Sequence, residues 1–586
     1  MTTHGATGRG EGERGSVIVP VLVLLIVLSI SVSALLRYSA QEVRSVRDLN
    51  AYKRAMVAAE AGLEKGICEL RNLIVAHGEP TQGELDAVQP PTLPGYVFET
   101  PDASSAFSLL IDGGAHHSET IVEGRWAGLV GDWQGYLLRS GVVEPASRRG
   151  VVLAQSFQKL VIPLFQFAIF YEQDLEILPG ADMTISGPVH TNDGMWVGAE
   201  SGSSLSFDDR VTVRSDILHG RKDSASEMTG GVTFRNKANT AVSMYVDGEG
   251  WVDHRLAGWG VRALQLWGER VSDSAHNVPR LNLPIPHENV PHEIIERAVT
   301  GGDPALEENK FENKANLIIW RDSTGTIRAK TGDGAAFPLT YTVYVGGTRT
   351  TRTIATSASF ADWREGNGTA KTMHSLDINI ANLKAHPGYP QTGVCVYTYN
   401  NYRPSGTAAV CRLKSGSELP AGGLTVASPN PVYIQGSYNA TGTTRPALVC
   451  GDAVTILSNA WTDSNSTKTL TYRKASNTIV NTVIMTGNTA TVVGQYNGGL
   501  ENVLRFQEDW SGITLRYRGS LICLWLSTIA SGPWVYGNNR YTAPIRDWGY
   551  DTMYRDVRNA PPAVPQVYAL EALTWHQDSW GEDERL

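Results

Sequence analysis

The sequence is poor in cysteine, in strongly basic segments and in recognisable catalytic motifs. Five cysteines among 586 residues are too few for a disulfide-rich scaffold. Lysine and arginine number 50 against 59 acidic residues, which gives a formal net charge of −9. Since no strongly basic run is present either, we expect no nucleic acid as a partner.

No pattern of residues predicts catalysis or a bound cofactor. His287 and His292 have the spacing HExxxH rather than that of a zinc-protease helix, and Pro291 interrupts the helix which that motif needs. Residues 366–372 have alanine where a phosphate-binding loop needs glycine before the lysine. A nucleophile elbow and an EF-hand loop are also missing. We therefore expect a protein that is not an enzyme, with no catalytic residue, no cofactor and no metal ion.

The cysteines leave two interpretations open. Cys395 and Cys411 are close in sequence, and the glycine and proline between them would allow a disulfide in an oxidising compartment. The alternative is that both are simple buried thiols.

The most informative feature that is present is an apolar run near the N-terminus. Residues 17–36 are twenty consecutive residues without a charged side chain, directly after Arg14, Gly15 and Ser16. As a helix, this run spans roughly 30 Å, about the hydrocarbon thickness of a bilayer. It predicts a membrane-spanning helix, so most of the remaining chain lies on one side of the membrane.

The helical pattern continues beyond the apolar run with apolar residues on one face only. We expect a single helix over residues 17–76, on the order of 90 Å long, that ends before Gly78 and Pro80. The apolar face of its second part, which includes Met56 and Leu63, is predicted to pack on a small sheet near Trp126. The residues that recur at intervals of three or four on this face are Leu49, Tyr52, Met56, Ala59, Leu63, Ile67, Leu70 and Ile74.

Three kinds of segment fit this pattern: a signal peptide cut near Ala34, a permanent anchor, and the spine helix of a pilin-like subunit. The leader that ends in Arg14-Gly15, the apolar start at Ser16 and the alanine-rich residues 58–63 resemble the N-terminal domain of PilX-type minor pilins and K-type pseudopilins of secretion systems. The resemblance covers about the first 75 residues. It implies that a prepilin peptidase cuts after Gly15 and methylates the new amino terminus at Ser16.

Two features depart from that family. Many pilins carry glutamate at the fifth mature position, where this sequence has Pro20, and no acidic residue follows until Glu42. Because a first subunit has no neighbour whose amino terminus needs that acid, we predict a position at the filament tip, in few copies. The positive charge beyond the apolar run favours the opposite membrane orientation by the positive-inside rule, whereas the resemblance implies an exported ectodomain.

The remainder of the chain is too long for one ordinary domain, and its many glycines and tryptophans favour β structure with many turns. In residues 165–286 very short apolar stretches follow one another at steps of six to ten residues, which predicts a β-solenoid, with an ordinary sandwich as the alternative. The predicted fold class is α+β and mostly β: a spine helix, then a solenoid-like ectodomain with an inserted α+β module. The predicted parts are a leader (1–15), the transmembrane and amphipathic spine (16–76), a pilin-like head sheet (77–164), a first solenoid-like part (165–286), the inserted module (287–417), and a second β-rich part with a C-terminal wrap (418–586).

These observations favour a pilin-like minor subunit of a type IV pilus or pseudopilus, with a structural or assembly role and an adhesive one if the ectodomain binds a surface. Its expected partners are the prepilin peptidase, other pilin or pseudopilin subunits and the lipid bilayer. We place the chain in a bacterial inner membrane as a single-pass protein, with the ectodomain in the periplasm or on a filament. The alternatives are a permanently anchored surface protein that binds envelope or surface carbohydrate, and an anchored hydrolase.

Overall fold

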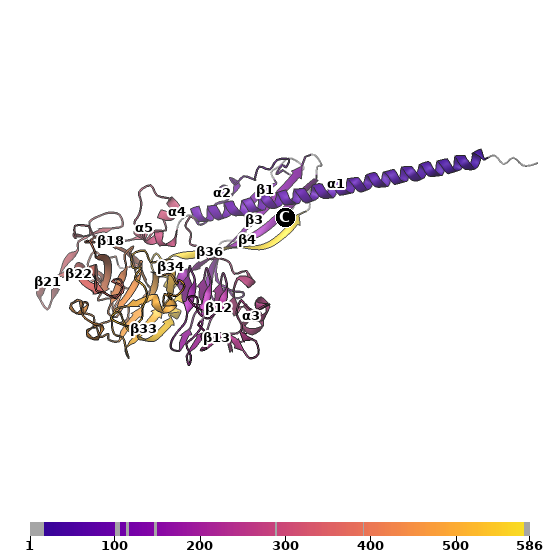
Figure 1. Cartoon of the computed structure of the whole chain (residues 1–586). Coiled ribbons are helices and arrows are strands. Elements are labelled where there is room, and N and C mark those ends of the chain that lie inside the picture. The colour runs from indigo at the N-terminus through magenta and orange to yellow at the C-terminus, as the bar shows by residue number, and fades with distance from the viewer. Residues whose placement is uncertain are drawn as a thin grey trace, which may run out of the picture.

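The computed structural model describes residues 17–99, 106–112, 117–145, 149–224, 226–286, 290–390 and 392–578. A long N-terminal helix projects from a β-rich remainder (Figure 1). This confirms the coarse fold class, because strands take up 37% of the residues and helices 22%.

The N-terminal helix, α1 (Ile18–His77), is continuous over 60 residues and confirms the single helix predicted from the apolar pattern. It ends where expected: Gly78 adopts a φ of +66°, and its N–H donates to the carbonyl of Ile74 at 2.8 Å. Its first part is exposed, and burial begins at Ala51. Hence the helix divides into an exposed outer half and an inner half that packs on protein.

The inner half of α1 lies on an antiparallel sheet, which we call the head sheet (Figure 1). Its strand order is β1-β3-β4-β36, with β2 paired to β3. The last strand comes from the far end of the chain and pairs with β4, from Gln566 opposite Pro163 onward. The head sheet is therefore completed by the C-terminal strand. In the sequence, the rest of the protein, which we call the body, lies between β4 and β36, and these two strands are neighbours in the head sheet. The bounds are β1 (Phe107–Ile111), β2 (His117–Thr120), β3 (Val130–Glu144), β4 (Arg149–Pro163) and β36 (Gln566–Asp578), with the short helix α2 (Gln82–Asp86) beside β1.

The body consists mainly of short parallel strands in several sheets. The largest sheet has eleven strands in the order β17-β11-β8-β5-β34-β31-β28-β26-β24-β18-β19, of which only the outer pair β18–β19 is antiparallel. These strands are β5 (Ile169–Tyr171), β8 (Val189–Thr191), β11 (Val211–Val213), β17 (Val271–Ser272), β18 (Leu317–Arg321), β19 (Ile327–Thr331), β24 (Val394–Asn400), β26 (Leu424–Ala427), β28 (Ala447–Cys450), β31 (Val483–Asn488) and β34 (Leu521–Leu526).

Four further sheets of the body have three to six strands each. Their strand orders are β12-β9-β6, β22-β23-β25-β27-β29-β32, β14-β13-β10-β7 and β30-β33-β35. Their strands are β6 (Leu175–Ile177), β7 (Met183–Ile185), β9 (Met195–Val197), β10 (Ser204–Phe207), β12 (Ile217–His219), β13 (Gly231–Arg235), β14 (Ala241–Ser243), β22 (Ala355–Asp362), β23 (Lys371–Asn379), β25 (Ala408–Lys414), β27 (Val432–Gln435), β29 (Val454–Leu457), β30 (Thr478–Asn481), β32 (Leu504–Phe506), β33 (Thr514–Gly519) and β35 (Ile545–Tyr550).

The body also contains short helices and two separate hairpins. The hairpins are β15 (Tyr245–Val246) with β16 (Gly250–Trp251) and β20 (Thr340–Val345) with β21 (Thr348–Thr353), and the helices are α3 (Trp259–Trp267), α4 (Pro304–Glu307), α5 (Phe311–Lys314) and α6 (Ile380–Lys384). The 3-10 turns used below are η1 (Leu164–Gln166), η2 (Gly268–Arg270), η4 (Pro291–Ile295), η7 (Gly499–Asn502) and η8 (Thr552–Arg555).

The chain order within the large sheet is divided into two runs. The first run leads outward from β5 to β17, and the second leads from β18 back to β34, which pairs in parallel with β5 through Leu521 opposite Ile169. Residues 287–417, predicted as an inserted module, contribute β18 and β24 to this sheet and β22, β23 and β25 to the six-stranded one. Strands of that segment are thus shared with the sheets of its neighbours.

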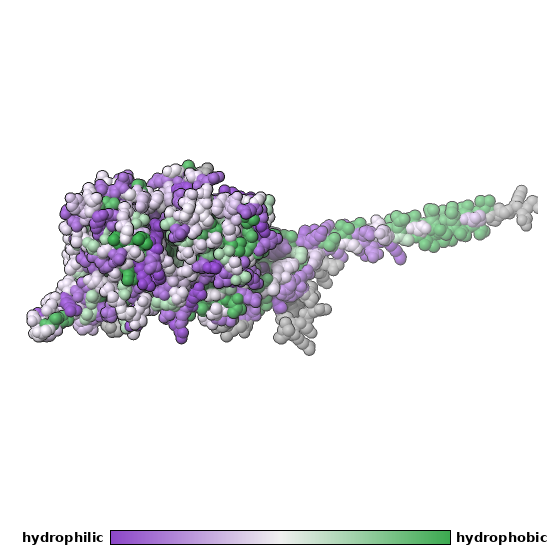
Figure 2. Space-filling view, turned by 90° about the horizontal axis from the view of Figure 1, so that it is seen from below, coloured by the Kyte–Doolittle hydropathy of each residue, from purple (hydrophilic) through white to green (hydrophobic). Residues whose placement is uncertain are grey.

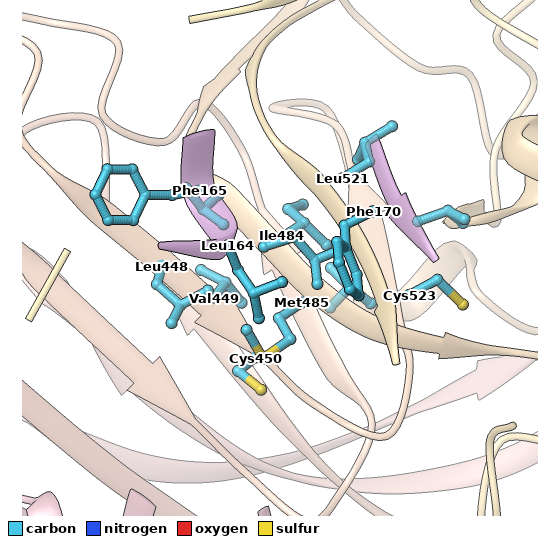
Figure 3. Close-up of a cluster of buried hydrophobic side chains, with 14 of the residues drawn as sticks. Leu164, Phe165, Phe170, Leu448, Val449, Cys450, Ile484, Met485, Leu521 and Cys523 are labelled. Carbon is cyan, nitrogen blue, oxygen red and sulfur yellow. The ribbon is translucent and has the colours of Figure 1, made fainter. Parts of the chain in front are cut away.

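The interior of the body is apolar and is built across this junction. Figure 3 shows Phe170 of β5, Ile484 and Met485 of β31, and Leu521 of β34 packed together from segments far apart in sequence. Every described residue of β5, β8, β11, β28 and β29 is buried. The sequences of these short strands are mostly apolar because both faces of each strand are buried, as expected for parallel sheets that are covered on both sides.

The structure contradicts the disulfide between Cys395 and Cys411, because all five cysteines are free thiols. Cys411 Sγ lies 3.5 Å from Ser428 Oγ and 3.6 Å from Thr398 Oγ1, whereas Cys395 belongs to β24 of the other sheet. Burial raises the pKa of Cys395 to about 12 and that of Cys411 to about 11. Both cysteines therefore act as small apolar side chains of the core.

Thiol labelling of the native protein is expected to modify Cys68 alone, because it is exposed and the other four thiols are buried. Since the thiolate is the reactive form, the raised pKa of the buried groups protects them further. Mass spectrometry after alkylation, without reductant, should find one modified cysteine in the native protein and five in denaturant. Recovery of a linked peptide pair would contradict the free-thiol assignment.

Candidate functional site

The outer half of α1 is the largest exposed apolar surface of the described chain. Leu24, Leu28 and Leu35 on this half are each more than half exposed, and Figure 2 shows this part of the helix as hydrophobic. The segment has a mean hydropathy of 2.8, and none of it is buried, so the helix is long and apolar enough to cross a membrane. An apolar surface of this size requires either lipid or other apolar helices around it.

Processing is predicted at Gly15 and Ser16, and both residues lie outside the described part of the chain. Pro20 is the third residue of α1 and is exposed. The first four N–H groups of a helix have no partner within it, so a proline at this position breaks no hydrogen bond. The structure thus accommodates Pro20 without a break in the helical hydrogen-bond pattern, while its role between subunits stays a prediction.

The inner half of α1 approaches the head sheet very closely because small residues face it. A Cβ added to Gly66 would lie 2.6 Å from Leu138 Cδ1 of β3, and one added to Gly62 would lie 2.7 Å from Phe98 Cε1. The spacing of these small residues is a sequence signal for the close contact, in addition to the apolar periodicity. The buried residues of this half are Ala51, Ala55, Ala58, Ala59, Gly62, Leu63, Gly66, Leu70, Ile74 and Val75.

Met56 and Leu63 lie on this contact face, as the periodicity indicated. Leu63 is 3% exposed in the apolar cluster between helix and sheet, and Met56 packs against the same cluster at its edge. The prediction that Trp126 lies beneath them is wrong. Trp126 follows Gly124 (φ +77°) in a loop and packs instead on Phe167 of the body, with ring centroids 6.3 Å apart.

Polar contacts fix the inner half of the helix to three different strands. The guanidinium of Arg54 donates to Glu144 at 3.0 Å at the end of β3, and the hydroxyl of Tyr52 donates to Gln577 at 2.7 Å in β36. At the far end the ammonium of Lys159 in β4 donates to the carbonyl of Gly78. The C-terminal strand β36 therefore contacts α1 and is also paired within the head sheet.

Head and body are joined through hydrogen bonds to the backbone. The side chain of Gln166 in η1 accepts from Val130 N at 2.7 Å and donates to Val130 O at 2.6 Å. Asn282 and Tyr568 exchange both backbone hydrogen bonds, at 2.9 and 2.8 Å. These hydrogen bonds therefore join the head sheet to the body.

The body contains a cleft where its two runs of strands meet. In the large sheet the two runs are joined by the pairing of β34 with β5, and elsewhere η7 packs against β6. By contrast, β35 and β7 are each the last strand of a sheet and are not paired with one another in the described sheets. A cavity of about 370 Å³ opens between them, and its lining includes Ile169, Leu500, Leu521, Arg546 and Trp548.

This cleft has the composition of a binding pocket. It is mostly apolar with few polar groups, which is typical of pockets for small ligands. Within the described ranges, no group of three or more histidine, cysteine or acidic side chains is placed to hold a metal ion.

His292, from the segment with the HExxxH spacing, has a structural partner instead. Its Nε2 lies 3.3 Å from Asp452 Oδ1, and its Nδ1 lies 3.0 Å from Glu296 Oε1. Asp452 is buried and also accepts from the backbone N–H groups of Thr528 and Ala530, at 2.6 and 2.8 Å. Burial lowers the pKa of His292, but the hydrogen bonds and charges of Asp452 and Glu296 outweigh it and raise the pKa to about 9.

The body is expected to lose stability when the pH rises from 6.5 to 9. The folded-state pKa of His292 lies above its unfolded value of 6.5, so its contribution is complete below pH 6.5 and disappears as the pH passes 9. The shift corresponds to about 3 kcal/mol. Urea denaturation at pH 6 and pH 9.5 measures this loss, and H292Q should reduce the difference; an equal pH dependence in the variant would contradict the assignment.

Comparison with known proteins adds little to this geometry. No protein-family model matches the sequence, and no curated protein matches it. Among solved structures, the crystal structure of the competence-associated pilin ComZ from Thermus thermophilus matches with 12% identity and a TM-score of 0.28. The match covers 90% of this chain and 97% of that one. Similarity at this TM-score does not establish a shared fold.

Proposed function

We propose that this chain is a pilin-like, membrane-anchored subunit of a type IV pilus or pseudopilus. The observation that carries the proposal is the division of α1: one continuous helix is apolar and exposed over its outer half and seated on an antiparallel sheet over its inner half. The outer half can lie in a bilayer before assembly and against the apolar helices of other subunits afterwards. The same helix would thus serve as anchor and as assembly surface.

In this proposal the leader of residues 1–15 is removed by a prepilin peptidase after Gly15, and Ser16 becomes the amino terminus. The minor-pilin assignment follows from the resemblance of the first 75 residues. The tip position follows from Pro20, since a subunit without the fifth-position acid loses least where no neighbour's amino terminus has to be neutralised. Immunogold label at filament ends supports the tip position, and label along the shaft contradicts it.

We further propose that the body is a split β-solenoid. The parallel, in-register pairing of short strands from successive turns of the chain supports this, as does the join of β34 to β5. An adhesive or substrate-contacting role would then use the solenoid surface, which lies at the opposite end of the molecule from the outer half of α1 (Figure 1).

The second candidate function is that of a permanently anchored surface protein that binds envelope carbohydrate. The cleft between β7 and β35, with Trp548 and Arg546 in its wall, is the observation that favours it. In that case the outer half of α1 would contact lipid only.

Site-specific photo-crosslinking distinguishes the two functions. A photoreactive residue in place of Leu28, which is 58% exposed on the outer half of α1, is expected to capture other pilin-like subunits in cells that make filaments. The matched control replaces Val493, which is 93% exposed on the body, and should not capture them. If Leu28 yields only lipid adducts in such cells, the anchored-receptor function is favoured and the filament role is wrong.

A further inference from the structure

A second, polar cavity of about 400 Å³ lies where the head meets the body. Residues 127–129 belong to the loop between β2 and β3, which we call the head loop, and they line the cavity. The body contributes Asp208, Asp209, Arg210 and Arg270 to the same lining. Arg555 of η8 also reaches the cavity. This site is separate from the cleft between β7 and β35.

Two of the arginines around this cavity are side by side because of strand register. Arg210 directly precedes β11, and Arg270 directly precedes β17. These strands are paired in parallel with Val211 opposite Val271. Since neighbouring strands are about 4.8 Å apart, the two arginines are cross-strand neighbours, an arrangement that is unfavourable for like charges.

The two carboxylates that line the cavity, Asp208 and Asp209, are each paired with another arginine. Asp208 accepts from Arg235 Nε at 2.8 Å, and Asp209 accepts from Arg555 at 3.0 Å. Each acid therefore already has an arginine of its own. The carboxylates of Asp209 and Glu269 favour the charge on Arg210 electrostatically, but neither forms an ion pair with it among the described residues.

Arg210 itself is held only by neutral acceptors. Its Nε donates to the carbonyl of Ala127 at 3.0 Å, and its Nη1 donates to the carbonyl of Glu269 at 3.2 Å. Arg270 has no hydrogen-bond or ion-pair partner in the described part of the chain. Burial and the charge of Arg270 lower the pKa of Arg210. Arg210 and Arg270 thus share the cavity, and within the described ranges no carboxylate forms an ion pair with either of them.

We propose that this cavity binds an oxyanion, with Arg210 and Arg270 both donating to one carboxylate, sulfate or phosphate group. Guanidinium groups form short, charge-assisted and often bidentate hydrogen bonds with such anions. The volume exceeds that of a bare anion and leaves room for a carrier of the size of a monosaccharide. Because Arg210 also holds the head loop through Ala127, the bound anion stabilises the contact between head and body.

The test measures thermal unfolding and calorimetric binding of the full-length protein in detergent, at constant ionic strength. Sodium phosphate, sodium sulfate and glucuronate are titrated separately, so that the inorganic anions are distinguished from a sugar acid. We expect a saturable rise in Tm with at least one anion, because a ligand that binds only the folded state stabilises it. In R270Q, binding should be at least about tenfold weaker, since one charge-assisted pair is lost.

Two controls separate anion recognition from a structural role. In buffer without these anions, R270Q should unfold at the same or a higher temperature than the parent, because it removes one of two like charges; a lower Tm would show that Arg270 is needed for folding and would contradict the proposal. R558Q replaces an arginine whose side chain is 86% exposed away from the cavity lining, and should leave binding unchanged. Absence of a saturable effect with all three anions, or equal effects in R270Q, would overturn the oxyanion site.

Discussion

Replacement of Leu63 by aspartate is expected to detach the inner half of α1 from the head sheet. Leu63 is 3% exposed and belongs to the apolar cluster that joins α1 to β3 and β4. An aspartate at this position loses the buried leucine contacts and places an unpaired carboxylate in an apolar site, which costs about 3 kcal/mol or more. Changing Met56 to aspartate as well should add to the loss at the edge of the same cluster.

The measurement is protease sensitivity of the head in detergent-solubilised full-length protein. Val57 provides the matched control, because it is on the same helix and 65% exposed. L63D should be cleaved in the head at protease concentrations that leave the parent and V57D intact, while membrane insertion is unchanged. Equal resistance of L63D and V57D would show that the inner half of α1 is not seated on the sheet.

The second large effect is expected from Arg412, a fully buried arginine of β25. Its guanidinium forms two hydrogen bonds with Asp377, at 2.6 and 2.9 Å, and two with Asp463, at 2.6 and 3.0 Å. Arg412 and Asp377 face each other across paired strands. Removal of the arginine in R412M leaves the Asp377 carboxylate buried, with a hydrogen bond from the Ser375 hydroxyl at 2.5 Å and Lys414 at 3.6 Å as the nearby cation. This loss should cost about 3–5 kcal/mol.

The double variant R412M/D377L tests the reason for that loss. Because replacement of a whole buried ion pair by apolar residues is often nearly neutral, the double variant should recover most of the stability lost in R412M. Urea denaturation followed by tryptophan fluorescence measures both. If the double variant is less stable than R412M, the loss comes from packing around Arg412 rather than from an uncompensated charge.

Features encoded by local spacing can be predicted from the sequence. The apolar run and the three-to-four spacing around Leu63 predict the extent of α1 to within about one residue at each end, because helical hydrogen bonds connect residues only four apart. The short steps between apolar stretches likewise indicate the strands of residues 165–286. The close helix–sheet contact at Gly62 and Gly66 is also encoded in the spacing of small residues.

Features that depend on long-range pairing cannot be predicted in this way. The partner of β36 is β4, about 400 residues earlier in the chain, and the partner of β34 is β5. Apolar strands of three residues, such as β5, do not specify their neighbours, because many of them have the same pattern. For this reason the sequence indicates only a wrap for the C-terminal segment, and it predicts neither the cleft nor the neighbouring positions of Arg210 and Arg270. Of the two interpretations of Cys395 and Cys411 that the sequence leaves open, the structure fits the free thiols, because the two residues are near in sequence but lie on strands of different sheets.

The proposed role requires that α1 becomes the N-terminal spine of a processed, pilin-like subunit. Mass spectrometry of the amino-terminal peptide from native membranes decides whether this processing takes place. We expect a peptide that begins at Ser16, and we expect a G15V variant, whose branched side chain should block the peptidase, to keep residues 1–15. An intact Met1 in the native protein, or a terminus near Ala34, would contradict the pilin-like role.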